Sequence, residues 1–218
     1  MHSENLITMK KSLIALAFGT LGLGIAEFVM MGILPDVAKA LNISIATAGH
    51  LISAYAIGVC VGAPLLIIAR KYPLKNILLV LVSMIMLGNI IAASAPNYWI
   101  LMLGRFISGL PHGAYFGVGS IVAEKLADKG KGSEAVSIMI AGMTVANLFG
   151  VPLGTLLSAA ISWRMTFFIG RRLGSAYPLL YLALGASGRK TTRYRFQGTV
   201  PFFEITGSLV NLRSDHAR

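Results

Sequence analysis

Charged side chains are scarce in this sequence. They make up 12% of its 218 residues, whereas hydrophobic residues make up 56% and the mean hydropathy is +0.74. Because soluble domains usually contain about 25% charged residues, this composition excludes an ordinary soluble domain. With long apolar runs in place of short alternating ones, the sequence predicts an all-α integral membrane protein.

Cysteine is almost absent, and so are the local motifs of common enzymes. The single cysteine, Cys60, excludes an intrachain disulfide and lies in an apolar run, where we expect it to pack. The chain contains no H-E-x-x-H, P-loop or G-x-S-x-G motif, and GLGIAE lacks the third glycine of a dinucleotide fingerprint. We therefore predict neither an enzyme nor a metal or cofactor site.

The net charge of +11 does not indicate nucleic-acid binding. Residues 171–218 supply +6 of it, because they contain eight basic and two acidic residues. No stripe of basic residues interleaved with aromatic ones follows an expected helix face, as a nucleic-acid interface would require. The partner that this composition favours is the lipid bilayer.

Five long apolar runs predict membrane-spanning helices, since about 20 apolar residues cross the hydrocarbon core. Turn-forming or charged segments such as LPDVAKALNIS, RKYPLK and EKLADKGKGSE separate them. After a short cytoplasmic segment at 1–11, we expect helices over residues 12–34, 46–69, 77–95, 99–123 and 135–161.

The apolar pattern breaks down after the fifth run. A sixth helix should begin near Met165, but MTFFIG leads directly into Arg171 and Arg172, and arginine inside a span is costly. One interpretation is a short or interrupted sixth helix followed by a basic tail. The interpretation that we favour is that the chain after Gly170 is not the natural continuation, as after a frameshift. We thus expect one helix bundle over 12–170 and an irregular tail over 171–218.

Basic residues are distributed unevenly between alternate loops. With a cytoplasmic N-terminus, the outer loops carry two, Lys39 and Arg164, and the inner loops carry eight. Basic residues favour the cytoplasmic side, so we predict a multi-pass protein of the inner (plasma) membrane with its N-terminus in the cytoplasm. The eight inner residues are Lys10, Lys11, Arg70, Lys71, Lys75, Lys125, Lys129 and Lys131.

One carboxylate interrupts the first apolar run. Glu27 is the only charged residue between Ser12 and Leu34, and an acid at the centre of a span costs about 2.5–3.5 kcal/mol. Its helical face also carries Gly24 and Met31, a small residue and a deformable thioether that suit a cavity wall. An acid that faces a cavity inside a membrane can carry a proton, and we predict this role for Glu27.

The fourth run contains two further ionisable groups, Arg105 and His112. They share one helical face, because successive residues turn by about 100°, and Gly109 and Phe116 lie on the same face. Arginine keeps its proton, so Arg105 must meet a carboxylate, backbone carbonyls or water. We expect a direct or water-bridged contact with Glu27; the alternative is that Arg105 extends to the interface and binds carbonyls. His112 is a second candidate proton carrier, or it makes an ordinary interhelical hydrogen bond.

Small residues recur at every fourth position of the fifth run. Residues at this spacing let helix backbones approach closely, which packing alone can explain. Pro152 removes one backbone hydrogen bond and permits a bend, so the combination suits a helix that rocks against a neighbour. The small residues are Gly142, Ala146, Gly150 and Gly154.

Several segments carry a further signal because they occur in order at the expected helix positions. They include GIAEFVMMGILPDVA with Glu27, GRFISGLPHG with Arg105 and Gly109, and GVPLGT at residues 150–155. Together with RKYPLK and SWRMTFF, they resemble the N-terminal half of a major facilitator superfamily transporter. The resemblance covers residues 9 to about 170. It is closest to the drug:proton antiporter group, which includes arabinose, sugar, nucleoside and chloramphenicol efflux proteins.

The segment RKYPLK departs from the pattern of that family. It occupies the loop between the second and third helices, where the family has an aspartate in place of Ala69 and a glycine in place of Pro73. Arg70 and Lys75 keep the basic character of the loop. The resemblance therefore implies a conformational role for these two residues, although the acidic partner of the usual charge relay is missing.

The resemblance implies two six-helix halves, with substrate bound between them and access that alternates by rocking. This chain has room for one half with a degraded or truncated sixth helix, so we expect it to be inactive without a C-terminal half. In the complete protein Glu27 would bind the proton or compete with a cationic substrate, and Arg105 would tune Glu27. The fifth helix, through Gly150, Pro152 and Gly154, would support the switch. The implied function is proton-coupled efflux of a small organic solute such as a sugar, nucleoside or drug.

Two other functions stay open at this point. A non-transporting membrane assembly or interaction module would use Glu27 and Arg105 as a structural pair. A channel or intramembrane enzyme would use Glu27 and His112, but no second catalytic group lies at motif spacing.

Overall fold

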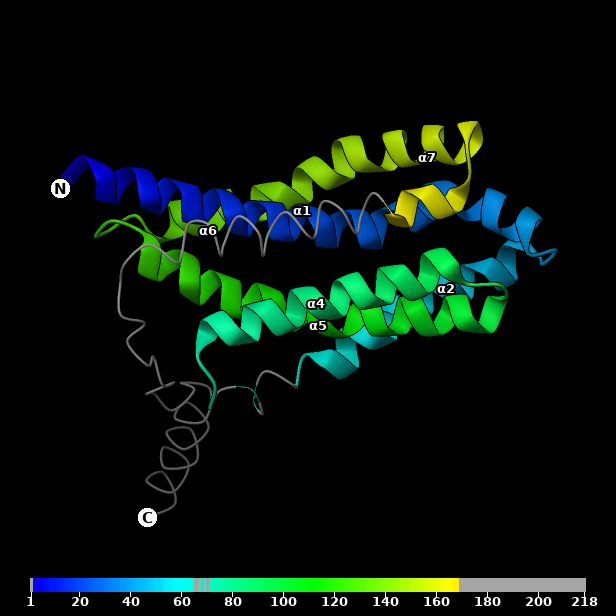
Figure 1. Ribbon diagram of the computed structural model, residues 1–218, viewed down its shortest axis with the longest axis horizontal. Coiled ribbons are helices and arrows are strands. Elements are labelled where there is room, and N and C mark those ends of the chain that lie inside the picture. The colour runs from blue at the N-terminus through cyan, green and yellow to red at the C-terminus, as the bar shows by residue number, and fades with distance from the viewer. Residues whose placement is uncertain (1, 65–66, 68, 70, 169–218) are drawn as a thin grey trace, which may run out of the picture.

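The chain forms a bundle of long helices in the computed structural model, which describes residues 2–64, 67, 69 and 71–168 (Figure 1). Every regular element within those residues is helical, which confirms the predicted all-α class. A short helical stretch at 163–168 follows the last numbered helix. The elements are α1 (His2–Ala40), α2 (Ile45–Gly62), α4 (Leu74–Ser94), α5 (Tyr98–Leu126), α6 (Gly132–Val145), the π-helical turn η1 (Ala146–Gly150) and α7 (Val151–Ala160).

Within the residues that the structure describes, four segments are long and apolar enough to cross a membrane. The fourth predicted span, 99–123, is not among them; it lies inside α5, which has 29 residues and a length of about 43 Å at 1.5 Å per residue. Helix α5 is less apolar because it carries Arg105, His112 and several glycines. The four apolar segments are Ser12–Ala40, Ile45–Gly62, Asn76–Ser94 and Gly132–Ala160.

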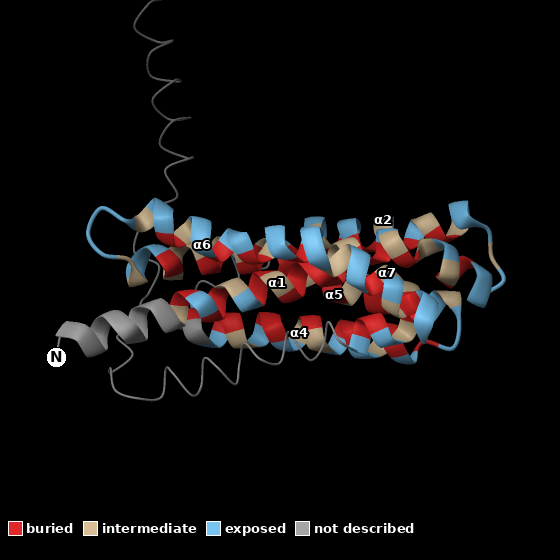
Figure 2. Ribbon diagram, turned by 90° about the horizontal axis from the view of Figure 1, so that it is seen from above, coloured by how far each residue is buried: buried red, intermediate tan, exposed pale blue. Residues whose placement is uncertain are grey.

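Large apolar side chains point outwards from this bundle. Trp99 is 73% exposed and Leu156 is 66% exposed, whereas Arg105 and Ser108 are completely buried. Figure 2 shows buried residues toward the interior of the bundle and exposed residues along its outer faces. A bilayer rather than water suits such a surface, since large exposed apolar areas are rare on soluble monomers.

Helix α2 ends earlier than the apolar run predicts, at Gly62 instead of residue 69. The N–H of Ala63 still donates to the backbone oxygen of Val59 at 3.1 Å, but Pro64 follows and has no N–H to donate. The expectation that Cys60 packs inside is wrong, because this thiol is exposed. The opposite face of α2 takes the close contact with α5.

Helix α1 is longer than its predicted span and continues through Pro35 to Ala40. Val37 and Ala38 are buried, so tertiary packing holds the turn that follows the proline. Sequence reasoning placed the end at residue 34, where the turn-forming segment LPDVAKALNIS begins. Packing of this last turn overrides that local preference.

The fifth predicted helix is interrupted by η1, close to Pro152. In a regular α-helix residue 152 would donate its N–H to the backbone oxygen of Leu148, but proline has no N–H and its ring would clash with that carbonyl. A π-helical turn over Ala146–Gly150 accommodates the mismatch, and such turns often occur at functional positions.

The helices pack in two groups. Helix α5 packs most extensively against α4 and α2, whereas α1 packs against α6, η1 and α7. Figure 1 shows α1, α6 and α7 in the upper part of the bundle and α2, α4 and α5 in the lower part. Contacts of α1 with α2 and α5, and of α5 with α6, join the groups.

The small-residue ladder of α6 and α7 lies against α1. A Cβ atom at Gly142 would meet the backbone oxygen of Ala17 and Oγ1 of Thr20, and one at Gly154 would lie 2.6 Å from Cγ2 of Val29. The hydroxyl of Thr20 donates to the backbone oxygen of Met139 at 2.5 Å. The close helix approach predicted from the ladder is therefore confirmed.

Some predictions concern residues that the structure does not describe. These are the role of Arg70, the sixth helix beyond Phe168, the tail at 171–218, and the side chain of Lys75. Each of them stays a prediction.

Candidate functional site

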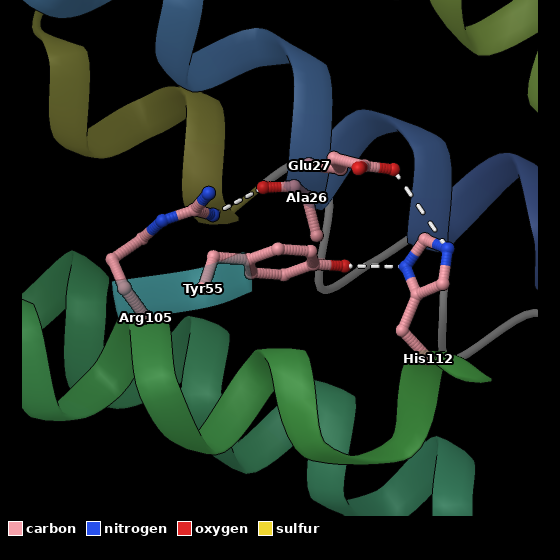
Figure 3. A network of polar contacts seen from close by, with 5 residues as sticks. All are labelled: Ala26, Glu27, Tyr55, Arg105 and His112. Atoms are coloured by element: carbon pink, nitrogen blue, oxygen red, sulfur yellow. Dashed lines mark hydrogen bonds and ion pairs between the residues drawn. The ribbon is translucent and has the colours of Figure 1, made fainter. Parts of the chain in front are cut away.

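Three helices bring the predicted site residues together (Figure 3). Glu27 comes from α1, and Arg105 and His112 come from α5. Tyr55 of α2 lies between the two α5 side chains. Gly109 permits this arrangement, because a Cβ atom there would meet the backbone oxygen of Tyr55, so a larger residue would push α2 away from α5.

Arg105 is completely buried and is bound by backbone carbonyls. Its Nη1 donates to the backbone oxygen of Ala26, and its Nε donates to that of Leu51 at 3.4 Å. The guanidinium carbon lies 4.4 Å from the centre of the Tyr55 ring, within cation–π range. Carbonyl dipoles and an aromatic face therefore compensate part of the buried charge, while Nη2 has no hydrogen-bond partner among the described residues.

The expected direct contact between Arg105 and Glu27 is not formed among the described side chains. Arg105 reaches the carbonyl of the preceding residue, Ala26, while the Glu27 carboxylate points away along α1 toward His112 (Figure 3). A direct Glu27–Arg105 pair, as in the alternative hypothesis, is thus not formed here, and a water-bridged contact stays a prediction. The expectation that Arg105 extends to the interface is also wrong, although its binding to carbonyls is confirmed.

His112 links Glu27 to Tyr55. Its Nε2 lies 3.8 Å from Oε2 of Glu27, and its Nδ1 lies 2.8 Å from the Tyr55 hydroxyl. The imidazole stacks on Phe116 with ring centres 5.3 Å apart, so the shared face predicted for these α5 residues is confirmed. The 3.8 Å separation is longer than a direct hydrogen bond, so the two charged or polar groups interact electrostatically or through water.

Glu27 is only partly enclosed. Its side chain is 29% exposed, yet Oε2 is buried and has no hydrogen-bond partner. On the same helical face Gly24 packs against Ala146 of η1, whereas Met31 is 52% exposed. A carboxylate oxygen without a hydrogen bond, beside an accessible face, can take a proton or a donor group of a ligand.

The ladder residues of the fifth predicted helix contact the part of α1 that carries Glu27. A Cβ atom at Gly150 would lie 3.0 Å from Cγ1 of Ile25, and one at Gly154 would press on Val29. These two α1 residues lie on either side of Glu27 in the sequence. A change in the conformation of η1 or α7 would therefore displace α1 close to the Glu27 carboxylate.

Sequence reasoning missed Tyr55. Apart from His50, it is the only ring-bearing residue in α2, and its polar tip inside an apolar run was the available signal. Among the described residues no three His, Cys, Asp or Glu side chains gather into a group that could hold a metal ion.

Comparisons with known proteins identify one family of membrane transporters. A family model for the Major Facilitator Superfamily matches residues 16–213. The putative transporter AraJ of Escherichia coli (strain K12) is 52% identical over 162 residues, which cover 74% of this chain and 41% of that protein. The inner membrane transport protein YdhP of the same strain is 46% identical, with 74% and 42% covered. A probable sugar efflux transporter of Helicobacter pylori (strain ATCC 700392 / 26695) is 32% identical, with 72% and 39% covered.

A solved structure supports the fold. The peptide transporter POT in complex with alafosfalin superposes with a TM-score of 0.72 at 14% sequence identity, covering 94% of this chain and 44% of that chain. The chain therefore spans about two-fifths of the length of the curated relatives named above.

Proposed function

Because this chain belongs to the Major Facilitator Superfamily, we propose that it forms one half of a proton-coupled efflux transporter for a small organic solute. The observation that carries the proposal is the buried Oε2 of Glu27, which has no hydrogen-bond partner and faces His112 inside an apolar helix bundle. Such a group is costly to insert and is typical of ion or proton pathways in membrane proteins.

The roles of the site residues follow from their contacts. Glu27 binds the proton or a cationic group of the substrate, because its carboxylate combines partial exposure with a buried oxygen that has no hydrogen-bond partner. Arg105 supplies a fixed positive charge near it, anchored to α1 and α2 through backbone oxygens. His112 faces the carboxylate and takes part in proton exchange with it.

The substrate and the second half of the transporter belong to the same proposal. The name of the Helicobacter pylori relative supports a sugar, and the resemblance to drug:proton antiporters leaves nucleosides and drugs as further solutes. Transporters of this superfamily bind substrate between two halves, so a C-terminal half completes the site.

An inner-membrane location with a cytoplasmic N-terminus is part of the proposal. Figure 1 shows the N-terminus and the α5–α6 loop at one end of the bundle, and the α1–α2 and α4–α5 loops at the other. The α5–α6 loop carries Lys129 and Lys131, and Lys125 lies in the last turn of α5, whereas the opposite end carries Lys39 and Arg164. This distribution supports a cytoplasmic N-terminal end.

The test is the Glu27→Gln variant in a chimera of this chain with the C-terminal half of AraJ. The amide keeps the size of the side chain but cannot carry the proton, so we expect export driven by a pH gradient to fall to background. The measurement is efflux of radiolabelled arabinose and chloramphenicol from proteoliposomes, with a pH-sensitive dye inside.

Glu124→Gln is the matched control, because Glu124 is an exposed acid near the end of α5. It should leave export unchanged, and both variants should insert into membranes to the same extent. Unchanged pH-driven export by the Glu27→Gln chimera would overturn the assignment.

A further inference from the structure

Tyr55 occupies a central position that the proposed roles leave unexplained. It is 2% exposed, its ring packs under the Arg105 guanidinium, and its hydroxyl lies 2.8 Å from Nδ1 of His112. The Tyr55 and His112 rings meet edge to face with centres 5.8 Å apart. Tyr55 therefore lies between the fixed cation and the histidine that faces Glu27 (Figure 3).

The hydrogen bond between Tyr55 and His112 can have either of two polarities. A neutral imidazole carries its hydrogen on one nitrogen and accepts on the other. If Tyr55 donates to Nδ1, the imidazole hydrogen is on Nε2 and faces Oε2 of Glu27. If Tyr55 accepts from Nδ1, the imidazole presents a bare nitrogen to Glu27 instead.

Burial decides between these polarities. His112 is the one hydrogen-bond partner of the Tyr55 hydroxyl in the part of the chain that the structure describes. If Tyr55 accepted from Nδ1–H, its own buried hydrogen would have no acceptor there, which is unfavourable. If Tyr55 donates, its hydrogen is bound, and Nε2–H is directed at a carboxylate oxygen that otherwise has no partner.

We propose that Tyr55 is a positioning residue that holds neutral His112 with its hydrogen on Nε2, so that a donor faces Glu27. Arg105 acts on Glu27 through this path, because its guanidinium holds one face of the Tyr55 ring while its Nη1 binds the carbonyl next to Glu27. The role of the donor in transport rests on the proposed function; the tautomer itself does not.

The test reads the tautomer directly. The 218-residue chain, labelled with ¹⁵N-histidine, is placed in phosphatidylethanolamine–phosphatidylglycerol nanodiscs at neutral pH. NMR separates protonated from unprotonated ring nitrogens, and comparison with a His112→Gln variant assigns His112 among the four histidines. We expect Nε2 of His112 to be protonated and Nδ1 to be unprotonated.

The Tyr55→Phe variant should populate both tautomers. Tyr115→Phe is the matched control, because Tyr115 is also buried but donates its hydroxyl to the backbone oxygen of Leu16 at 3.3 Å. It should leave the His112 signals unchanged.

A proton on Nδ1 in the wild-type chain, or on both nitrogens, would overturn the proposal even if Tyr55→Phe failed to fold. An unchanged tautomer in a folded Tyr55→Phe variant would also overturn it. If the tautomer is as expected but the Glu27→Gln chimera still exports, the proposed function fails and the positioning role of Tyr55 stands.

Discussion

Replacing Gly142 with alanine is expected to lower the free energy of unfolding by about 1–3 kcal/mol, the usual cost of overpacking. The added Cβ atom would meet the backbone oxygen of Ala17 and Oγ1 of Thr20 on α1. A backbone atom of a neighbouring helix cannot move aside without shifting the whole helix. The α1–α6 contact would therefore open, and with it the Thr20–Met139 hydrogen bond.

The matched control is Gly49→Ala in the first turns of α2. A Cβ atom at Gly49 would have no neighbour within 4 Å, so the better helix propensity of alanine should stabilise this variant by about 0.5–1 kcal/mol. Denaturant unfolding in detergent, followed by tryptophan fluorescence, compares the two variants. Equal stabilities would contradict the packing of the ladder on α1.

The Arg105→Ala variant is expected to lose about 3 kcal/mol of stability, the order of magnitude for losing hydrogen bonds from a charged donor. The guanidinium holds backbone oxygens of α1 and α2 and covers the Tyr55 ring, so its removal leaves a cavity where three helices meet. Arg105→Lys should recover only part of the loss, since an ammonium group lacks the planar fork of donors.

Arg164→Ala provides a control with similar contacts and less burial. Nη2 of Arg164 donates to the backbone oxygen of Ala95 at 2.8 Å, and its guanidinium lies 4.1 Å from the centre of the Trp163 ring. Because Arg164 is only partly buried, we expect a loss of about 1 kcal/mol. Thermal unfolding in the same detergent gives both values. Equal losses would show that the burial of Arg105 adds nothing.

The membrane class and the shared faces of α5 could be predicted from the sequence because both depend on local periodicity. Apolar runs of span length predict helices whatever the tertiary arrangement. The 100° turn per residue likewise places Arg105 and His112 on one side of any regular helix. The close approach of α6 and α7 to α1 was predictable for the same reason, since small residues every fourth position form one stripe.

The partner of each ionisable group could not be predicted in the same way. Whether Arg105 meets Glu27 or the carbonyl of Ala26 depends on the rotation of α1 about its axis, and a single residue separates the two outcomes. Tyr55 lies in a run without any motif, and its contacts arise from the docking of α2 on α5. The π-helical turn depends on how the backbone around Pro152 packs, and the sequence alone predicted only a bend at this proline.

Helix α1 binds residues that lie far from it in the sequence, and this has a consequence for biosynthesis. Ala26 and Arg105 are 79 residues apart, and Thr20 and Met139 are 119 residues apart. At about 5–20 residues per second, roughly 4–16 s pass between the synthesis of Glu27 and that of Arg105. During this interval the Glu27 carboxylate and the α1 residues that later pack against α5 and α6 have not yet met those helices. Because an uncovered acid inside a span is costly, we expect the first helix to stay close to the insertion machinery until the later helices emerge.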